Sequence, residues 1–193
     1  FEGNFELNDK GLPLNIKGRT GLCGQGLLGR LGPNYAADPV VTRYHPQHGK
    51  LQVVVITRHD TDELALPGGM VDHGEIVSNT LKREFIEEAG NLTDKHDLEL
   101  FQQTIATFFT NGTMLYQGYV DDPRNTDNSW IESSVYHFHL PNELADKLPL
   151  RAGDDAKAVQ WMTWDDENHD KDKMYASHKE FIELAVTQLA GNK

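Results

Sequence analysis

The stretch GGMVDHGEIVSNTLKREFIEEAG, residues 68–90, begins with two glycines and continues as an acidic segment with a helical pattern. Apolar residues recur every four positions and predict a helix over residues 76–88. Its inward stripe is formed by Val77, Leu81 and Phe85. Gly90 stands where a glycine commonly ends a helix. The stretch therefore predicts a glycine loop that leads directly into an amphipathic helix.

Three glutamates share one face of this expected helix. At about 100° per residue, Glu84, Glu87 and Glu88 fall within an arc of roughly 100°. Like charges at this spacing destabilise an isolated helix, so we expect a cation over that face. Mg²⁺ prefers oxygen ligands, and the carbonyl group of Gly69 could join the carboxylates. Such an ion would offset the charge of a diphosphate and activate a water molecule. The alternative interpretation is an acidic amphipathic helix without a special role.

The spacing of the fixed residues is more specific than their charge. The stretch resembles the Nudix box, G-x5-E-x7-R-E-U-x-E-E-x-G-U, in which U is a bulky apolar residue. Phe85 fills the first U position, whereas Asn91 stands at the last one and Leu92 follows it. We expect this shift to alter only a packing contact. The other fixed positions are occupied by Gly69, Glu75, Arg83, Glu84, Glu87, Glu88 and Gly90.

The resemblance to the Nudix family implies roles for these residues. Glu84 and Glu88 would be the principal metal ligands, and Glu87 would be a third ligand or the general base. Arg83 and Glu75 would orient these carboxylates by ion pairing. The expected cofactor is Mg²⁺, with Mn²⁺ as a substitute. Family members hydrolyse a nucleoside diphosphate linked to another group, and their fold is a mixed β-sheet sandwiched between helices.

Other segments extend the resemblance to one branch of the family. They read GRTGL, GLLGR, GPN, ADPVVTR, ALPGGMVD, GYVDDPRNTDN, GDDA and YASH. Together they resemble the ADP-ribose pyrophosphatases of mitochondrial type. They are equally similar to the C-terminal domain of the ADP-ribose-gated, melastatin-type cation channels. The similarity extends from about Leu12 to Ala185 and implies ADP-ribose as the small-molecule partner; within a channel, the chain would be a covalent part of a tetramer.

This branch binds its substrate through two segments, which this sequence matches at Asp122 to Arg124 and at Tyr175 to His178. Arg124 can fork onto a phosphate or hold a ribose. Asp122 can accept hydrogen bonds from ribose hydroxyls, and Tyr175 can stack on a base or a sugar. His178 either donates to a phosphate or is an ordinary histidine near a helix N-terminus. The expected substrate-binding residues are Met70, Asp122, Arg124, Tyr175, Ser177 and His178.

Two further pairs of residues are candidates for the site. Asp154 and Asp155 are either a general base or an extra metal ligand on a loop, or they are simply turn formers. His137 and His139 lie two apart on an expected strand and therefore share a face. Without a third ligand nearby, we interpret these histidines as structural.

The composition excludes several classes of partner. The chain has 193 residues and carries 18 basic against 30 acidic side chains, for a net charge of −12. Such a surface argues against binding to nucleic acid or to anionic lipid. Since no run approaches the roughly 20 apolar residues of a membrane span, we expect no direct membrane contact by this segment.

The single cysteine, Cys23, excludes an internal disulfide and a cysteine-rich zinc site, and it indicates a reducing compartment. Because the chain begins with Phe1, we expect a processed or excised piece of a longer protein. An intracellular location follows from these expectations. The chain would be the cytosolic domain of a membrane channel, or a soluble mitochondrial or cytosolic enzyme.

The rest of the chain alternates strands with helices, which predicts an α/β fold with a mixed sheet. Residues 1–46 show little periodicity and are expected to form a loop-rich N-terminal cap, with the catalytic core at residues 47–193. Asn111-Gly112 predicts a hairpin between the strands on either side of it. Helices are expected at residues 142–148 and after Ser177, which begins an S-x-x-E capping box. Strands are expected at residues 51–58, 63–66, 101–109, 113–120, 134–140 and 158–164.

Residues 24–29 match G-x-G-x-x-G, the dinucleotide-binding fingerprint. That motif functions only after a strand and at the start of a helix. The residues before it do not form a convincing strand pattern, and the sequence RLGP after it is a poor helix start. We therefore interpret these glycines as a surface loop with unusual dihedral angles.

Three functions remain open from the sequence. The first is a Mg²⁺-dependent hydrolase that cleaves ADP-ribose to AMP and ribose 5-phosphate. The second is the ADP-ribose sensor domain of a cation channel, which would still be hydrolytic because Arg83, Glu84, Glu87 and Glu88 are all present. The third is a Nudix enzyme of other specificity, such as one acting on NADH or a nucleotide sugar.

Overall fold

The computed structural model describes residues 3–90, 95–144, 148, 150–152 and 156–191. Its centre is a seven-stranded mixed sheet with the strand order β3-β2-β1-β6-β5, in which β4 pairs with β1 and β7 pairs with β2. The pair β1–β6 is parallel, and the other pairs are antiparallel. The strands are β1 (Gly32–Tyr44), β2 (Leu51–Arg58), β3 (Leu64–Ala65), β4 (Gly69–Met70), β5 (Thr113–Val120), β6 (Ser129–His139) and β7 (Ala156–Thr163).

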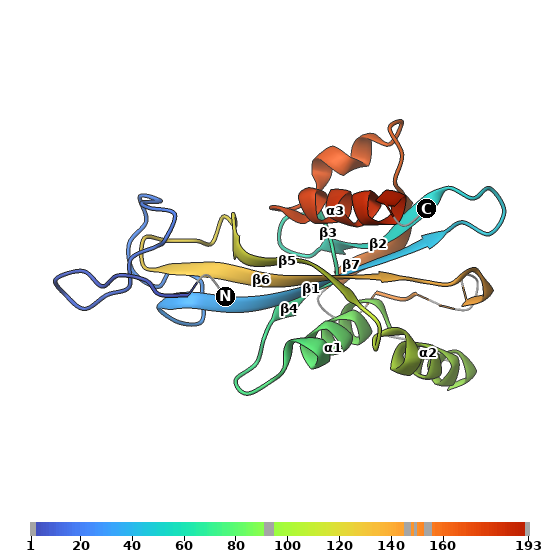
Figure 1. Ribbon diagram of the computed structural model, residues 1–193, viewed down its shortest axis with the longest axis horizontal. Coiled ribbons are helices and arrows are strands. Elements are labelled where there is room, and N and C mark those ends of the chain that lie inside the picture. The colour runs from blue at the N-terminus through green and yellow to red at the C-terminus, as the bar shows by residue number, and fades with distance from the viewer. Residues whose placement is uncertain (1–2, 91–94, 145–147, 149, 153–155, 192–193) are drawn as a thin grey trace.

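Helices cover both faces of this sheet, as the sequence predicts (Figure 1). One face carries α1 (Val77–Ala89) and α2 (Lys95–Phe108), and the opposite face carries α3 (His178–Gly191). Short 3-10 helices lie at Asn142–Leu144 and His169–Lys173. Successive residues of β1 therefore belong to different cores: Val40 packs in the cluster that includes α3, and Val41 packs in the cluster that includes α1 and α2.

One edge of β1 has an opening between two paired segments, and this opening lies next to the candidate site. On one edge, β1 pairs with β4 at residues 36–37 and with β2 at residues 42–44. The segment 66–68, which joins β3 to β4, passes this edge between the two pairings. Asp38 lies at the opening, and its carboxylate is next to Gly68.

Helix α1 forms where the apolar stripe predicts it. Leu81, Phe85 and Ala89 are buried, and Gly90 is the C-cap. The backbone of Gly90 has φ −114°, so the cap does not require the left-handed conformation that glycine favours. A glycine is needed for another reason, since a β-carbon there would overlap the ring of Phe101 on α2.

The expectation of a loop over residues 1–46 is wrong for residues 32–44, which form the central strand β1. This strand is paired on both edges and covered on both faces, so it shows no alternation of apolar and polar residues. Pro39 also interrupts the strand pattern of the sequence. The fold accommodates this proline because it lies between the residues of β1 that pair with β4 and those that pair with β2.

The hairpin expected around Asn111-Gly112 is also wrong. Residues 101–108 belong to α2, and β5 pairs with β6 instead. The aromatic and β-branched residues of this segment predict a β-strand, but the same apolar residues also suit a buried helix face, on which Phe101, Ile105 and Phe108 lie. Gly112 permits close packing, because a β-carbon on it would overlap Phe138.

The remaining elements agree with expectation where they are described. Strands cover the expected ranges 51–58, 63–66, 134–140 and 158–164 to within a few residues. Residues 24–29 are turns and bends, as expected for a loop. The helix expected at 142–148 is a single 3-10 turn in its described part, and residues 145–147 lie outside the description, as do Asn91 and Leu92.

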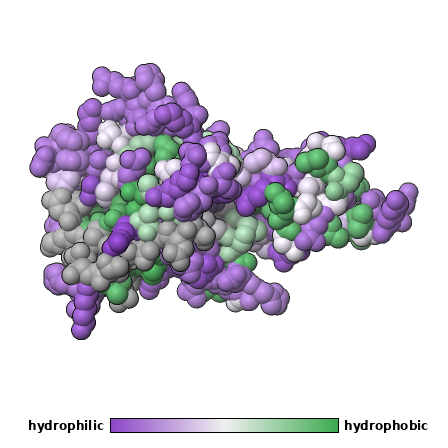
Figure 2. All heavy atoms as spheres, turned by 180° about the vertical axis from the view of Figure 1, so that it is seen from behind, coloured by the Kyte–Doolittle hydropathy of each residue, from purple (hydrophilic) through white to green (hydrophobic). Residues whose placement is uncertain are grey.

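Two surface features complete the fold. Figure 2 shows apolar side chains on the projecting end of the molecule; the N-terminal segment contributes the exposed residues Phe5, Leu7, Leu14, Leu22, Leu27 and Leu31. Across the described residues, no helix is both long and apolar enough to cross a bilayer.

Candidate active site

The guanidinium group of Arg83 organises the acidic face of α1. Its Nη1 lies 2.8 Å from Oε1 of Glu84 and 3.0 Å from Oε2 of Glu87. Its Nε and Nη2 donate to the two carboxylate oxygens of Glu75 at 3.1 and 3.0 Å. Nη2 also donates to the carbonyl oxygen of Met70 at 3.1 Å, so one side chain ties the helix to the glycine loop. We call Glu84, Glu87 and Glu88 the acidic ridge.

Two carboxylates of the acidic ridge lie against the glycine loop. A β-carbon on Gly69 would sit 2.5 Å from the carboxylate carbon of Glu84, so this carboxylate occupies the space of a side chain. The amide of Gly68 donates to Oε2 of Glu88 at 2.8 Å. Each glycine is required because a carboxylate takes the place where its β-carbon would be, that of Asp38 at Gly68 and that of Glu84 at Gly69.

The protonation of the ridge follows from this packing. Burial raises the pKa of Glu84 to about 7; the charge of Arg83 opposes the rise and that of Glu87 adds to it. The hydrogen bonds from Arg83 have the opposite effect on Glu75, whose pKa is lowered to about 2. In turn, Glu75 raises the pKa of Arg83 above its ordinary value. A carboxylate with a pKa near neutrality, next to two others, indicates a site that would gain from a cation.

The donor set of the ridge suits a hard divalent cation, because it consists of carboxylate and carbonyl oxygens. Within the described part of the chain, no three histidine, cysteine, aspartate or glutamate side chains converge on one point. The reason lies in the ion pairs, since Arg83 draws Glu84 and Glu87 toward itself. The residues fit the cation by the chemistry of their oxygen donors.

On the side of α3, Asp122 and Arg124 form a bidentate pair. Nε and Nη2 of Arg124 donate to the two oxygens of Asp122 at 2.8 and 2.9 Å, and the hydroxyl of Tyr175 donates to Oδ2 at 3.3 Å. Burial alone would raise the pKa of Asp122, but the hydrogen bonds from Arg124 outweigh it and the pKa is lowered. The Asp122 carboxylate therefore orients Arg124 and Tyr175.

The ring of Tyr175 contacts a cation, Arg58. The guanidinium carbon of Arg58 lies 4.2 Å from the centroid of that ring, within the range of a cation–π interaction. Arg58 also pairs with Asp60 at 2.7 Å. Sequence reasoning missed Arg58, because it lies at the end of β2, far from Tyr175 in the chain.

His178 lies at the start of α3 with its ring half-buried. Its Nδ1 accepts a hydrogen bond from the amide of Leu66 at 2.8 Å, so a neutral ring carries its proton on Nε2. Burial lowers the pKa of His178, and the negative charge of Asp38 opposes this effect. The imidazole is thus held as a neutral donor.

Asp38 is the central residue that sequence reasoning missed. Only 7% of Asp38 is accessible to solvent, and its carboxylate accepts a hydrogen bond from the hydroxyl of Ser133. The acid inside the apolar run AADPVV is the one signal for this residue in the sequence, which predicts a loop there.

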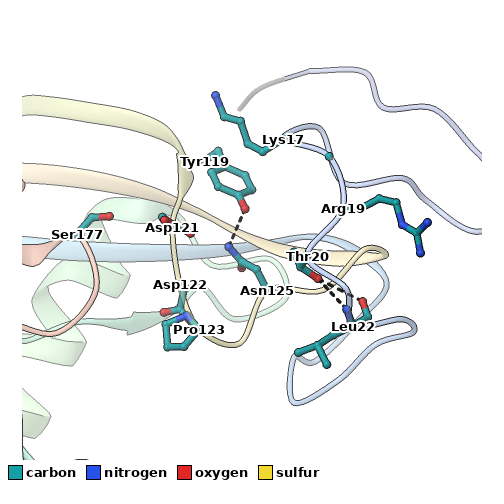
Figure 3. Close-up of a pocket in the computed structure, with 11 residues that line it drawn as sticks. Lys17, Arg19, Thr20, Leu22, Tyr119, Asp121, Asp122, Pro123, Asn125 and Ser177 are labelled. Carbon is teal, nitrogen blue, oxygen red and sulfur yellow. Dashed lines mark hydrogen bonds between the residues drawn. The ribbon is translucent and has the colours of Figure 1, made fainter.

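A cavity of about 700 Å³ extends from Asp122 and Ser177 toward the N-terminal segment. Figure 3 shows residues 17–22 facing residues 119–125, with Ser177 at one end. The side chain of Asn125 donates to the hydroxyl of Tyr119 at 3.0 Å and holds one wall. Ser177 and Asp122 both line this cavity, so the α3 side of the site and the cavity are continuous.

The remaining candidates are two aspartates, two histidines and Met70. Asp154 and Asp155 lie outside the described residues. His137 and His139 share the hydroxyl of Thr42, at 2.7 and 2.9 Å, and His137 also contacts Gln188. These contacts within the sheet and to α3 agree with a structural role. The side chain of Met70 packs at the margin of the core under α3.

Comparison with known proteins identifies the family. The NUDIX domain model matches residues 37–185, which include residues 37–44 of β1, the glycine loop, the acidic ridge and residues 178–185 of α3. This chain belongs to the Nudix family.

Relatives of this Nudix chain are similar over nearly all of its length. Putative nudix hydrolase 6 of Caenorhabditis elegans is 51% identical over 89% of the chain and 62% of the relative. ADP-ribose pyrophosphatase, mitochondrial, of Rattus norvegicus is 48% identical over 95% of the chain and 56% of the relative. Transient receptor potential cation channel subfamily M member-like 2 of Nematostella vectensis is 44% identical over 95% of the chain and 12% of the relative. The chain spans less than two thirds of each relative.

Solved structures agree on the fold. A MutT/nudix family protein from Enterococcus faecalis has a TM-score of 0.62 and 24% identity, covering 86% of this chain and 66% of that protein. The NUDIX domain of Shewanella oneidensis NrtR, solved with ADP ribose, has a TM-score of 0.57 and 17% identity, covering 82% of this chain and 89% of that domain. The Nudix fold expected from the box is therefore confirmed.

Proposed function

We propose that this Nudix chain hydrolyses ADP-ribose, with one water molecule, to AMP and ribose 5-phosphate. The observation that carries the proposal is the contact of the acidic ridge with the glycine loop, in which Glu84 packs on Gly69 and Glu88 accepts from Gly68. This contact sets two carboxylates of the ridge against the backbone of the glycine loop. The 48% identity to a protein named ADP-ribose pyrophosphatase supports the choice of substrate.

The metal that this reaction needs is Mg²⁺, with Mn²⁺ as a substitute. Glu84, Glu88 and the carbonyl group of Gly69 would hold it, and Glu87 would be a third ligand or the general base. When bound, such an ion offsets phosphate charge and lowers the pKa of a bound water. Glu87 is the most exposed carboxylate of the ridge, with 56% of its side chain accessible, so it can reach a water molecule.

The protein residues on the α3 side would bind and orient the substrate. Arg124, held by Asp122, presents a guanidinium of fixed orientation to a phosphate or a ribose. Nε2 of His178 can donate to a phosphate oxygen because Leu66 occupies Nδ1. Tyr175 offers a ring for stacking, and Ser177 and Met70 would complete the contacts. Asp154 and Asp155 stay candidates for a general base or an additional metal ligand.

The test is product analysis by mass spectrometry after incubation of ADP-ribose with Mg²⁺ in ¹⁸O-labelled water. We expect AMP and ribose 5-phosphate, with one ¹⁸O atom in one of them, and the labelled product identifies the phosphorus attacked. NADH and UDP-glucose serve as competing substrates. Faster hydrolysis of either one would assign the chain to another Nudix specificity, and no hydrolysis of any would reject the enzymatic function.

A second candidate function is an ADP-ribose sensor domain of a cation channel, in which the chain is part of a tetramer. The supporting observation is the 44% identity to a channel over 95% of this chain. Since β1 belongs to the core, only the segment before Gly32 would be a cap, and in a channel this cap would face other parts of the assembly. Sequencing the full-length transcript distinguishes the two: upstream membrane-spanning segments indicate a cytosolic channel domain, and a transit peptide or short leader indicates a free mitochondrial or cytosolic enzyme.

A further inference from the structure

Residues 24–28, which we call the Gly26 turn, lie against the β5–β6 loop that carries Arg124. They include the first two glycines of the G-x-G-x-x-G match. An ideal β-carbon on Gly26 would be 2.8 Å from Cγ2 of Thr126 and 3.8 Å from the backbone oxygen of Arg124. The backbone of Gly26 has φ +63°, a conformation that favours glycine. The hydroxyl of Thr126 donates to the carbonyl oxygen of Gly24 at 2.6 Å, so the turn and the loop are in direct contact.

The N-terminal segment also satisfies the polar groups at the end of this loop. The amide of Thr20 donates to Oδ1 of Asp127 at 2.6 Å. The amide of Gly24 donates to Oδ1 of Asn128 at 2.8 Å. Residues 125–128 are polar and at most 8% accessible, and a buried polar group without a partner costs free energy. These hydrogen bonds therefore help to hold the loop in its observed conformation.

The Gly26 turn is itself fixed to the body of the protein. Leu28 is 4% accessible and belongs to the core cluster under α3. Its carbonyl oxygen accepts a hydrogen bond from Nε2 of Gln25 at 2.7 Å, which closes the turn. The chain then enters β1, where the amide of Gly32 donates to the carbonyl oxygen of Asn128 at 2.8 Å. Because the turn is anchored in this way, the loop that packs against it is held relative to the sheet.

The internal hydrogen bonds of the β5–β6 loop orient Arg124 but do not place it. The amide and Nε of Arg124 both donate to Oδ1 of Asp122, at 2.9 and 2.8 Å. The amide of Asn125 donates to the carbonyl oxygen of Asp122 at 3.0 Å. All these bonds lie within four consecutive residues, so they shape one end of the loop without fixing its position on the protein. The contact with Gly26 supplies such a position, because it lies beside the carbonyl group of Arg124.

We propose that Gly26 and Thr126 are positioning residues for Arg124, because their close contact sets where the β5–β6 loop lies on the protein. This inference rests on the proposed function, since it assigns the contact to binding of the same substrate. A turn that only stabilised the fold would lower stability when altered and leave substrate binding unchanged. A positioning contact makes a different prediction: its displacement raises KM and leaves kcat nearly the same.

The first experiment compares Gly26→Ala with Gly11→Ala in the whole chain. Gly11 is a matched control, because its φ is +74° and a β-carbon there would meet none of the described atoms within 4 Å. Alanine is strained at both positions, so both variants should lower Tm. We expect only G26A to raise KM for ADP-ribose, by roughly tenfold, as a displacement below 1 Å can do. Equal KM values in G26A and G11A would overturn the proposal.

The second experiment tests the contact itself and its action through Arg124. Thr126→Ser removes the methyl group that the new β-carbon meets and keeps the hydroxyl that donates to Gly24. In G26A/T126S, KM should return to within about twofold of G11A, whereas the loss of Tm should persist. In G26A/R124A, KM should not exceed that of R124A alone, because both changes affect one group. A KM that stays high in the first double variant, or rises further in the second, would reject the proposal.

An NMR measurement without turnover separates this inference from the proposed function. In ¹⁵N-arginine-labelled protein, the Nε–H signal that disappears in R124A belongs to Arg124. It should shift in G26A, return in G26A/T126S and stay in place in G11A; a signal that G26A leaves unmoved would overturn the proposal. If G26A does not fold, Thr126→Val, which removes the hydroxyl bonded to Gly24, should shift the same signal, and an unmoved signal would again overturn it. A wild-type chain inactive on ADP-ribose would reject the proposed function, and the Arg124 signal would still decide whether the contact positions this residue.

Discussion

The carboxylate of Glu84 lies directly against the backbone of Gly69, at a distance that excludes a side chain: a β-carbon on residue 69 would be 2.5 Å from Cδ of Glu84. The glycine is therefore required by a residue 15 positions later in the sequence, on α1. Because Glu84 is a proposed metal ligand, the same contact links the packing of the loop to the proposed metal site.

This relationship predicts that Gly69→Ala displaces the Glu84 carboxylate and lowers kcat for ADP-ribose by roughly 100-fold, the loss typical of a displacement near 1 Å. Steady-state kinetics at saturating Mg²⁺ measure it. Gly29→Ala is the matched control, since a β-carbon there would meet only Oδ1 of Asn34, at an ordinary 3.7 Å. A G69A variant as active as G29A would contradict the role of this contact.

Replacing Glu87 and Glu88 together with glutamine should abolish turnover and preserve the fold. Glutamine at position 88 keeps an oxygen that can accept from the Gly68 amide. The two substitutions together remove two negative charges that the cation requires. Activity assays and circular dichroism check the two halves of this prediction. The double change of the exposed residues Glu99 and Glu183 to glutamine is the charge-matched control. More than about a tenth of wild-type activity in the ridge variant would argue strongly against metal binding there.

Arg124→Ala should raise KM for ADP-ribose at least roughly tenfold, because a charge-assisted bidentate group is lost. It should also lower the free energy of unfolding by about 2 kcal/mol, since Asp122 is left buried without its cation. The double variant D122N/R124A separates the effects: it should recover stability and keep the high KM. Urea unfolding and steady-state kinetics provide both readouts. An unchanged KM in R124A would remove Arg124 from the site.

The ion pair of Glu75 with Arg83 predicts a pH dependence of stability. The folded-state pKa of Glu75 is about 2, below its ordinary 4.5, so the unfolded state binds this proton more tightly. The stabilisation is therefore complete above about pH 4.5 and is lost as the pH falls toward 2. Glu75→Gln should lower the unfolding free energy by on the order of 1 kcal/mol at pH 7 and by much less near pH 2.5. Urea titrations at both pH values, with Glu183→Gln as the control, check it; a pH-independent difference would contradict the assignment.

Gly90→Ala tests the packing of α1 on α2. The added β-carbon would overlap the Phe101 ring, so the free energy of unfolding should fall by roughly 2 kcal/mol. Phe101→Leu in the same chain should relieve part of that loss. Gly191→Ala, where a β-carbon would meet nothing within 4 Å, should cost far less. Equal stability of G90A and G191A in urea would show that the two helices adjust without strain.

The α1 helix and the residues of its acidic face were predictable from the sequence. Contacts within this unit span short distances along the chain: Arg83 meets Glu75 and Glu87 eight and four residues away. Helical periodicity brings such residues together whatever the rest of the fold does. Strand β2 was also predictable, since its run of β-branched residues is local.

Other elements depended on partners distant in the chain. β1 looks like a loop because it is covered on both faces by elements that follow it, and α2 looks like a strand because its aromatic residues suit either core. Arg58 meets Tyr175, and Asp38 meets Ser133, across separations of about a hundred residues. No local pattern in a sequence can report such a contact.

By itself, the sequence determined the Nudix box, the amphipathic helix and the residues that could hold a cation, because a helix converts fixed spacing into a shared face. Only the tertiary structure decided that Gly68 and Gly69 pass between Asp38 and two carboxylates of α1. It also decided that Asp122 accepts hydrogen bonds from both Arg124 and Tyr175. The physical reason is that the ionisation and the orientation of a buried charged side chain depend on the neighbours that the completed sheet brings to it.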